Sequence, residues 1–216
     1  MSRKVEQRQA SIERLLDSAL HLFVSQGYRS TNLEGIASAA RLSKGAVYFY
    51  FGSKEQVLVS LLERIQSIIV DAGIAAAGAA GPDAPDQLVA FLHHQAQLGV
   101  THRDEVLLLI LMSLEFSGRE GPASALIGRI YERQYAFIER IVKAGQKAGT
   151  LRDDLPSREL ASIIMANHDG TFLEWYRRSD SLRGRQMVAS LRGLVLAGVT
   201  SKAAAAAAQH RRRVAT

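Results

Sequence analysis

Residues that end and start helices follow one another at short intervals in the segment 27–56, and this spacing limits the fold most strongly. Upstream of it, apolar residues within 12–23 recur every three or four positions, which predicts a helix that ends at Gly27. Thr31 and Glu34 then have the spacing of a capping box. We therefore expect a short second helix to begin at Thr31.

Two more helix starts follow within the same segment. Ser43 can cap a third helix, Gly52 ends it, and Ser53 with Gln56 matches a second capping box that opens a longer fourth helix. Three short helices, the last two joined by a tight turn, make a helix-turn-helix arrangement. The apolar residues expected to face inward are Leu33, Ile36, Ala37 and Ala40 from the second helix and Val47 and Phe51, with Leu42, around the third.

The remainder of the chain also has helical periodicity, so we expect an all-α fold with three parts. These are a helix-turn-helix domain at 1–55, a larger helical domain at 56–200 and a basic, Ala-rich tail at 201–216. The tail is expected to be mobile, although extension of the last helix stays open. The segment 73–87 is predicted to be a helix end and linker. Further helices are predicted near 85–101, 104–117, 122–148, 157–178 and 181–200.

The composition excludes several classes of protein. The 216 residues include no cysteine, which excludes disulfides and thiolate sites for metals or redox chemistry. The N-terminus lacks the apolar core of a signal peptide, and the longest apolar run, 106–112, is far shorter than the roughly 20 residues of a membrane span. We therefore expect a cytoplasmic protein with no membrane segment.

Positive charge is concentrated at the two ends of the chain. Residues 1–54 hold eight Lys or Arg against four Asp or Glu, a balance of +4, whereas residues 55–200 have a balance of −2. The tail 201–216 adds another +4. A basic end on a nearly neutral body favours an anionic partner, and a solvated basic surface is the alternative.

In a helix-turn-helix the first residues of the second motif helix meet base edges in the DNA major groove. This places Ser43, Lys44, Gly45 and Ala46 closest to DNA. Lys44 can donate to guanine and Ala46 can touch a thymine methyl, while the small Gly45 permits close approach of the backbone. A small helical core with surface tyrosines is the alternative interpretation.

Other side chains nearby are candidates for phosphate contacts. Tyr48 and Tyr50 carry hydroxyl groups, and Lys54 adds a charge at the start of the next helix. Thr31 and Asn32 offer hydroxyl and amide groups at the start of the second helix.

The segment 27–58 combines Gly27, Thr31, the Ile36-Ala37 pair, Leu42-Ser43, Gly45, Tyr48, the Phe51 position and the run Ser53-Lys54-Glu55. With these residues in this order, the segment resembles the DNA-binding domain of the tetracycline-repressor (TetR) family. One departure is Arg41, which stands in the turn where that family usually has glycine. A non-glycine residue there has to adopt a left-handed conformation or shift the turn, and Arg41 could reach a phosphate in compensation.

The resemblance implies a dimeric transcription regulator, most often a repressor, that binds a palindromic operator in double-stranded DNA and is released by a small-molecule effector. Its C-terminal helices would carry the ligand pocket and the dimer interface, and burial of these faces within one subunit is the alternative. Candidate interface residues on the last two helices are Leu160, Ile164, Phe172, Trp175, Leu191, Leu194 and Val195. Candidate ligand-binding residues are His94, Glu115, Tyr131, Asn167, His168 and Asp169.

The sequence shows no catalytic motif of the HExxH, Walker A or G-x-S-x-G type, so neither an enzyme nor a cofactor is predicted. The His93-His94 pair points its rings in different directions on a helix, and His168-Asp169 lacks the spacing for a shared ion, so no metal site is predicted. The remaining alternative is a helical membrane-surface or scaffold protein with nonspecific affinity for anions.

Overall fold

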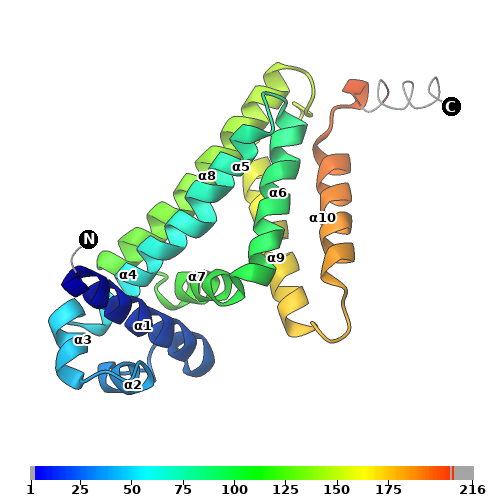
Figure 1. The fold of residues 1–216 in the computed structure, drawn as a ribbon. Coiled ribbons are helices and arrows are strands. Elements are labelled where there is room, and N and C mark those ends of the chain that lie inside the picture. The colour runs from blue at the N-terminus through cyan, green and yellow to red at the C-terminus, as the bar shows by residue number, and fades with distance from the viewer. Residues whose placement is uncertain (1–2, 205, 207–216) are drawn as a thin grey trace. The chain divides into compact units, whose positions relative to one another are not determined.

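The computed structural model describes residues 3–204 and 206, which are helical over most of their length (Figure 1). In the described part of the chain the only extended pairing is an isolated antiparallel bridge between Leu151 and Thr200. The all-α prediction is confirmed. The helices are α1 (Arg3–Gln26), α2 (Leu33–Ala39), α3 (Lys44–Phe51), α4 (Lys54–Gln66), α5 (Ala72–Ala79), α6 (Ala84–Thr101), α7 (Arg103–Glu115), α8 (Pro122–Lys147), α9 (Ser157–Arg177) and α10 (Gly184–Val199), with a π-helical segment η1 (Ser67–Asp71) between α4 and α5.

The chain divides into two compact units, neither of which is a single stretch of sequence. Unit 1 comprises Met1–Ile68 and His102–Ile130, and unit 2 comprises Ile69–Thr101 and Tyr131–Thr216. The predicted domains 1–55, 56–200 and 201–216 are continuous stretches of sequence, unlike these two units. This division stays a prediction. The predicted mobility of the tail concerns 201–216, of which 205 and 207–216 lie outside the described part of the chain, while 202–204 are helical.

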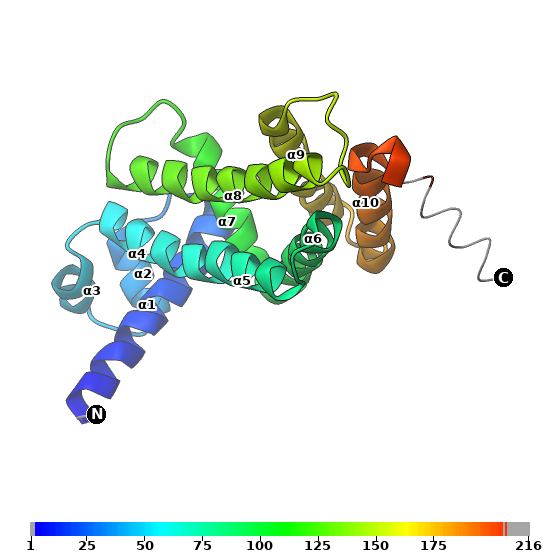
Figure 2. The same ribbon diagram turned by 90° about the horizontal axis from the view of Figure 1, so that it is seen from above.

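Unit 1 is built around the apolar side of α1, which packs on α2, α4 and α7. Leu15 and Phe23 of α1 are fully buried, as are Leu58 and Leu61 of α4. The first turns of α1, residues 3–10, are exposed throughout and project from the helices around them in unit 1 (Figure 2). The long α1 and the two short helices α2 and α3 therefore share one core with α4 and α7.

Unit 2 has its own hydrophobic core between α5, α6, α8, α9 and α10. Leu88 and Phe91 of α6 and Ile138 of α8 are fully buried there, and Ile164 of α9 and Leu191 of α10 close the same cluster. Each helix thus presents one apolar face, as its sequence periodicity predicts.

The predicted linker at 73–87 is shorter than expected. Residues 72–79 continue the long helix as α5, and the chain leaves helical structure only between Ala79 and Ala84. The reason is that this segment is rich in alanine, which is the strongest helix former. Gly73 is buried in the segment, and a Cβ added there would lie 3.4 Å from the Phe91 ring. The π-helical segment before α5 has no signal in the sequence pattern.

A substitution at Gly145 tests the packing of unit 2. A Cβ added there would lie 2.5 Å from Leu151 Cγ and 2.9 Å from Ala84 Cβ. Since overpacking of this kind typically costs about 1–3 kcal/mol, we expect Gly145→Ala to lower the melting temperature by several degrees despite the better helix propensity of alanine.

The matched control is Gly128→Ala in the same helix. A Cβ there meets open space, so this variant should gain up to about 1 kcal/mol from helix propensity. Thermal unfolding followed by circular dichroism compares the two. Stabilisation by both substitutions would contradict the close packing around Gly145.

Candidate nucleic-acid interface

The turn between α2 and α3 depends on Arg41, whose φ is 55°. It is the only non-glycine residue with positive φ in the described chain. Of the two alternatives expected for Arg41, a left-handed conformation or a shifted turn, the structure has the left-handed conformation. The amide of Arg41 donates to Ser38 O at 3.0 Å and that of Leu42 to Ala37 O at 2.9 Å, which closes the end of α2. The guanidinium-bearing side chain is exposed.

The first turn of α3 begins with exposed residues, and its fourth residue, Val47, is buried. Ser43 is the N-cap, as predicted, because its Oγ accepts a hydrogen bond from Ala46 N at 3.2 Å. Ser43, Lys44 and Gly45 are exposed, whereas Val47 is fully buried. A Cβ added at Gly45 would find its nearest neighbour at 3.9 Å, so this surface is open.

The aromatic residues of α3 divide between surface and core. Phe49 is 79 % exposed and Tyr48 is 46 % exposed, while Tyr50 and Phe51 are half-buried. Phe49 and Tyr50 pack edge to face with their ring centres 5.3 Å apart. Tyr48 therefore presents its hydroxyl group to a partner outside the chain more readily than Tyr50.

Lys44 has an ion-pair partner in the free protein. Its ammonium group pairs with the carboxylate of Glu34 on α2, and both side chains are exposed. The hydrogen bond to Glu34 raises the pKa of Lys44, so the side chain stays charged. An external acceptor has to displace Glu34, which costs little because exposed ion pairs are weak.

The second helix starts one residue later than predicted. Its N-cap is Asn32, whose Oδ1 accepts from Gly35 N at 2.8 Å, and not Thr31. Thr31 is 3 % exposed and its hydroxyl donates to Gly27 O at 2.9 Å. The capping-box spacing therefore predicted the wrong N-cap, because the Thr31 hydroxyl is hydrogen-bonded to backbone carbonyls at the end of α1 and just after it.

Four of the predicted DNA-contact residues line one hollow on the surface of unit 1. Its volume is about 260 Å³. It brings the start of α2 next to α3 and to the first residue of α4, which are adjacent in space and separate in sequence. The lining residues are Thr31, Asn32, Leu33, Glu34, Tyr48 and Lys54.

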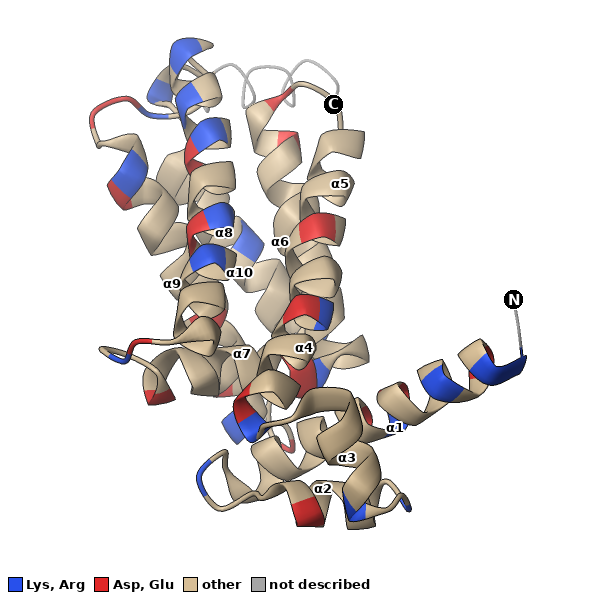
Figure 3. Cartoon of the chain, turned by 90° about the vertical axis from the view of Figure 1, so that its left-hand side faces the viewer, with Lys and Arg blue, Asp and Glu red and all other residues tan. Residues whose placement is uncertain are grey.

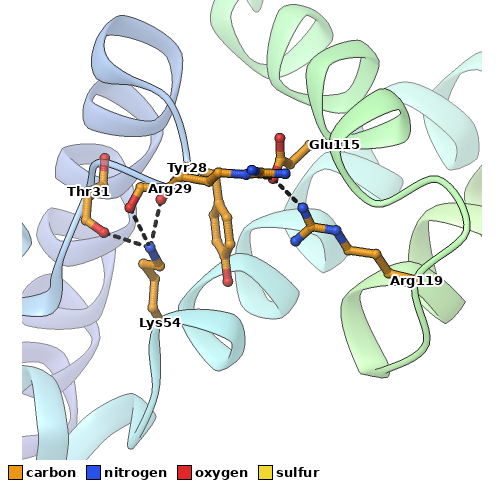
Figure 4. Close-up of polar contacts among 6 residues, drawn as sticks. All are labelled: Tyr28, Arg29, Thr31, Lys54, Glu115 and Arg119. Atoms are coloured by element: carbon orange, nitrogen blue, oxygen red, sulfur yellow. Dashed lines mark hydrogen bonds and ion pairs between the residues drawn. The ribbon is translucent and has the colours of Figure 1, made fainter.

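Lys54 points into the protein at one end of this hollow. Its Nζ donates to Tyr28 O at 2.7 Å, to Thr31 O at 2.8 Å and to Arg29 O at 3.3 Å (Figure 4). Burial lowers the pKa of Lys54 below its ordinary value. In contrast to Lys44, its ammonium group is already bonded to backbone.

Charged residues are unevenly placed on the helices. Figure 3 shows basic residues along the first turns of α1 and mixed charges along α8, but few charges on α2 and α3. The exposed start of α1 carries Arg3, Lys4 and Arg8 against Glu6. Long-range attraction for an anion is therefore stronger at α1 than at α3 itself.

The ligand candidates do not gather in one place. Glu115 lies in unit 1, where its carboxylate pairs with Arg29 at 2.7 Å and with Arg119 at 2.7 Å (Figure 4). The hydrogen bond from Arg29 lowers the pKa of Glu115. The other five candidates lie in unit 2.

In unit 2, candidates on α8 and α9 make contacts within their own helices, and a charge effect links Tyr135 of α8 to Asp169 of α9. The rings of Tyr131 and Tyr135 stack with centres 6.2 Å apart, and His168 Nδ1 lies 2.9 Å from Asp169 Oδ1. The pKa of Tyr135 is raised by burial and, secondarily, by the charge of Asp169. Asn167 is exposed and donates to Ile163 O at 2.8 Å.

Sequence reasoning missed Gln95, which is 2 % exposed. Its Nε2 donates to Ile69 O at 3.3 Å, while Gln95 Oε1 and the neighbouring His94 Nε2 are buried and have no partner in the described part of the chain. The signal was present, because Gln95 occupies a position of the apolar stripe that runs through Leu88 and Phe91.

Most dimer candidates are covered within their own chain. Leu160, Ile164, Leu191 and Val195 belong to the core cluster of unit 2, and Phe172 is 7 % exposed. A side chain that is already buried adds little area to an interface, so these five do not form the outer surface. Trp175 is half-buried and Leu194 is 73 % exposed.

The outer surface of α9 and α10 consists of other residues. Ile163 is 55 % exposed, and a Cβ added at Gly170, Gly193 or Gly198 meets nothing within 4 Å. A shallow hollow of about 410 Å³ lies between the two helices and includes Asn167 and Leu194 in its wall. These three glycines therefore leave space on the surface of α9 and α10 that the single chain does not fill.

The described residues include no cluster of three or more His, Asp or Glu side chains able to hold a metal ion. None of the helices among them is long and apolar enough to span a bilayer.

The α2–turn–α3 geometry defines a helix-turn-helix DNA-binding protein, and comparisons with known proteins agree. Residues 15–61 match the family described as "Bacterial regulatory proteins, tetR family". The transcriptional regulator AcrR of Shigella flexneri is 30% identical over 178 residues, which cover 81% of this chain and 83% of AcrR. The transcriptional repressor NicS of Pseudomonas putida is 27% identical over 154 residues, covering 70% and 71%.

Among solved structures, the MbdR regulator from Azoarcus sp. CIB is 45% identical, with a TM-score of 0.79, and the match covers 86% of this chain and 97% of MbdR. The chain belongs to the TetR family of DNA-binding transcription regulators.

Proposed function

We propose that this regulator is a repressor that binds a palindromic operator as a homodimer in the cytoplasm and leaves it when a small molecule binds. The observation that carries the DNA-binding part is the exposed first turn of α3, held by the buried Val47 and by the Ser43 cap. Two such turns in a dimer would read half-sites about one helical turn, ~34–36 Å, apart.

Base contacts are assigned to the first turn of α3. Lys44 is the side chain best able to donate to a guanine after it leaves Glu34, and the bare surface at Gly45 lets the backbone approach. Ser43 and Ala46 complete this surface. Arg41, Tyr48 and Tyr50 are assigned to phosphates, together with the exposed amide of Asn32. Thr31 contributes through its backbone, since its hydroxyl is engaged.

A dimer through the outer surface of α9 and α10 is supported by the exposure of Leu194 and Ile163. Exposed apolar side chains beside open glycine positions fit a second copy of the same two helices in a four-helix bundle. Leu194 and Ile163 replace the buried residues of α9 and α10 as the centre of this proposed interface.

A small-molecule site in unit 2 is supported by two buried polar atoms without a hydrogen-bond partner in the described part of the chain, His94 Nε2 and Gln95 Oε1. Buried polar atoms nearly always have partners, so two adjacent ones without a partner favour a ligand or an ordered water there. Tyr131, His168 and Asp169 add further polar groups to the same unit. A ligand that favours one of two conformations of the dimer would release the DNA.

Fluorescence anisotropy with the upstream intergenic DNA of the protein's own gene tests DNA recognition, with a scrambled duplex as control across a salt series. We expect preference for the native duplex and a steep loss of affinity with salt. Equal, weak binding to both duplexes, with no operator found elsewhere, would favour the scaffold or membrane-surface alternative, which liposome binding then examines.

Release by a ligand is tested on the operator complex. Compounds that raise the melting temperature of the protein are added to the complex, and the anisotropy should fall as the DNA dissociates. A library that yields stabilising compounds, none of which releases the operator, would contradict the proposed release.

Substitutions of Lys44 and Tyr48 separate base from phosphate contacts. We expect Lys44→Ala to lose about 1–3 kcal/mol of discrimination between the operator and a single-base variant, because a base contact carries sequence information. Tyr48→Phe should weaken all duplexes equally. Binding to operator, variant and scrambled duplexes measures both effects. Equal loss of discrimination in the two proteins would reject this division.

A further inference from the structure

The Lys54 side chain is bonded to its own protein at three points. Its ammonium group has three donors, and three backbone oxygens, those of Tyr28, Arg29 and Thr31, accept from it within 2.7–3.3 Å (Figure 4). The same nitrogen lies 4.4 Å from the centre of the Tyr28 ring. One side chain at the first residue of α4 thus holds the whole turn between α1 and α2.

The turn that Lys54 holds is fixed from other sides as well. The Tyr28 ring lies 5.2 Å from the rings of both Phe23 and Phe116. The Arg29 guanidinium pairs with Glu115 at the end of α7. Side chains from α1, α4 and α7 therefore converge on four residues that lead directly into α2.

We propose that Lys54 is a positioning residue for DNA binding and does not itself contact a phosphate. It fixes the turn 28–31, and the turn thereby fixes α2 and the α3 helix packed on it. This inference rests on the proposed operator binding. It reassigns a lysine whose place beside the hollow would otherwise suggest a direct contact with the DNA backbone.

The geometry favours the positioning role over a phosphate contact. To bind a phosphate in the neighbouring hollow, the Lys54 ammonium group would have to leave the partly buried carbonyl groups that it now contacts. These carbonyl groups would then lose their hydrogen-bond donor, which costs free energy. Arg41 and Tyr48 belong to the same motif, have exposed side chains and can reach a phosphate without such a loss. A phosphate contact by Lys54 therefore costs more free energy than one by Arg41 or Tyr48.

Two substitutions distinguish the roles. Lys54→Met removes the charge and keeps the stem, and Lys54→Arg keeps the charge but replaces the compact ammonium by a planar guanidinium, which cannot aim donors at three carbonyls from one point. Operator affinity is measured across a salt series with wild-type protein and both variants. Arg41→Met is the control for loss of a phosphate contact.

If Lys54 positions the turn, both variants should bind the operator at least about tenfold more weakly, with the salt dependence of wild type. If Lys54 contacts a phosphate, Lys54→Met should lower the slope of log K against log salt by about 0.9, as Arg41→Met should, and Lys54→Arg should bind like wild type. The second pattern overturns the proposal.

Hydrogen exchange of the free protein supplies a readout without DNA. Amides of residues 28–35 should exchange faster in both Lys54 variants than in wild type, whereas Arg41→Met should leave them unchanged. Unchanged exchange in folded Lys54→Met would overturn the positioning role. Failure of wild-type protein to prefer its operator would instead remove the proposed function, and the exchange result would still show whether Lys54 holds the turn.

Discussion

Leu194→Arg is expected to convert the dimer into monomers and to abolish tight operator binding. Leu194 is 73 % exposed in the single chain, and the proposed interface buries it in both copies. Burying a leucine contributes about 1.5–3 kcal/mol, and two-fold symmetry doubles the effect of each substitution. A loss of about 4 kcal/mol corresponds to a roughly 10³-fold higher dissociation constant for the dimer. The unpaired guanidinium adds a desolvation penalty.

Val100→Arg is the matched control, because Val100 on α6 is also 73 % exposed and lies outside the proposed interface. Analytical ultracentrifugation across protein concentration measures dimerisation, and anisotropy measures operator binding at the same concentrations. We expect Leu194→Arg to lose at least about 100-fold in operator affinity, since a monomer holds only one half-site. A dimeric Leu194→Arg, or equal losses in both variants, would reject this interface.

Helix boundaries and the core of the helix-turn-helix followed from local sequence signals. Ser43 and Ser53 cap α3 and α4 as predicted, because each serine accepts from the amide three residues later. For Arg41 the family resemblance left a left-handed conformation or a shifted turn open, and its φ of 55° is left-handed. The Ser43 and Ser53 caps depend only on neighbours in sequence, so the sequence was sufficient for them, whereas the Thr31 cap failed because its hydroxyl bonds to Gly27 O.

Features that depend on packing between distant segments were not predictable in the same way. Periodicity identified the apolar faces of α9 and α10, but it carries no information about whether the same chain or a second copy covers each side chain. It therefore did not separate the buried Leu191 from the exposed Leu194. Similarly, nothing in the sequence around Lys54 shows that its ammonium group turns toward carbonyls 23–26 residues away.

Gly45→Leu is expected to stabilise the protein slightly and to abolish operator binding. A Cβ at Gly45 has its nearest neighbour, Ser43 Oγ, at 3.9 Å, so the free chain accepts a larger side chain without strain. Replacing a helical glycine contributes up to about 1 kcal/mol, or roughly 2–4 °C in melting temperature. On DNA, the leucine would occupy the space in which the backbone of α3 approaches base edges. We expect affinity to fall at least about 100-fold, equivalent to about 2.8 kcal/mol.

Gly45→Leu should raise the melting temperature and lower the operator affinity. A misfolded variant would instead lose both stability and affinity, so misfolding cannot produce the expected result. Gly128→Leu is the control, because Gly128 is also exposed on a helix and its added Cβ meets open space. It should gain similar stability and bind the operator like wild type. Thermal unfolding and operator anisotropy on the same preparations decide between the outcomes. If Gly45→Leu binds the operator as wild type does, the first turn of α3 does not enter the groove and the recognition surface lies elsewhere.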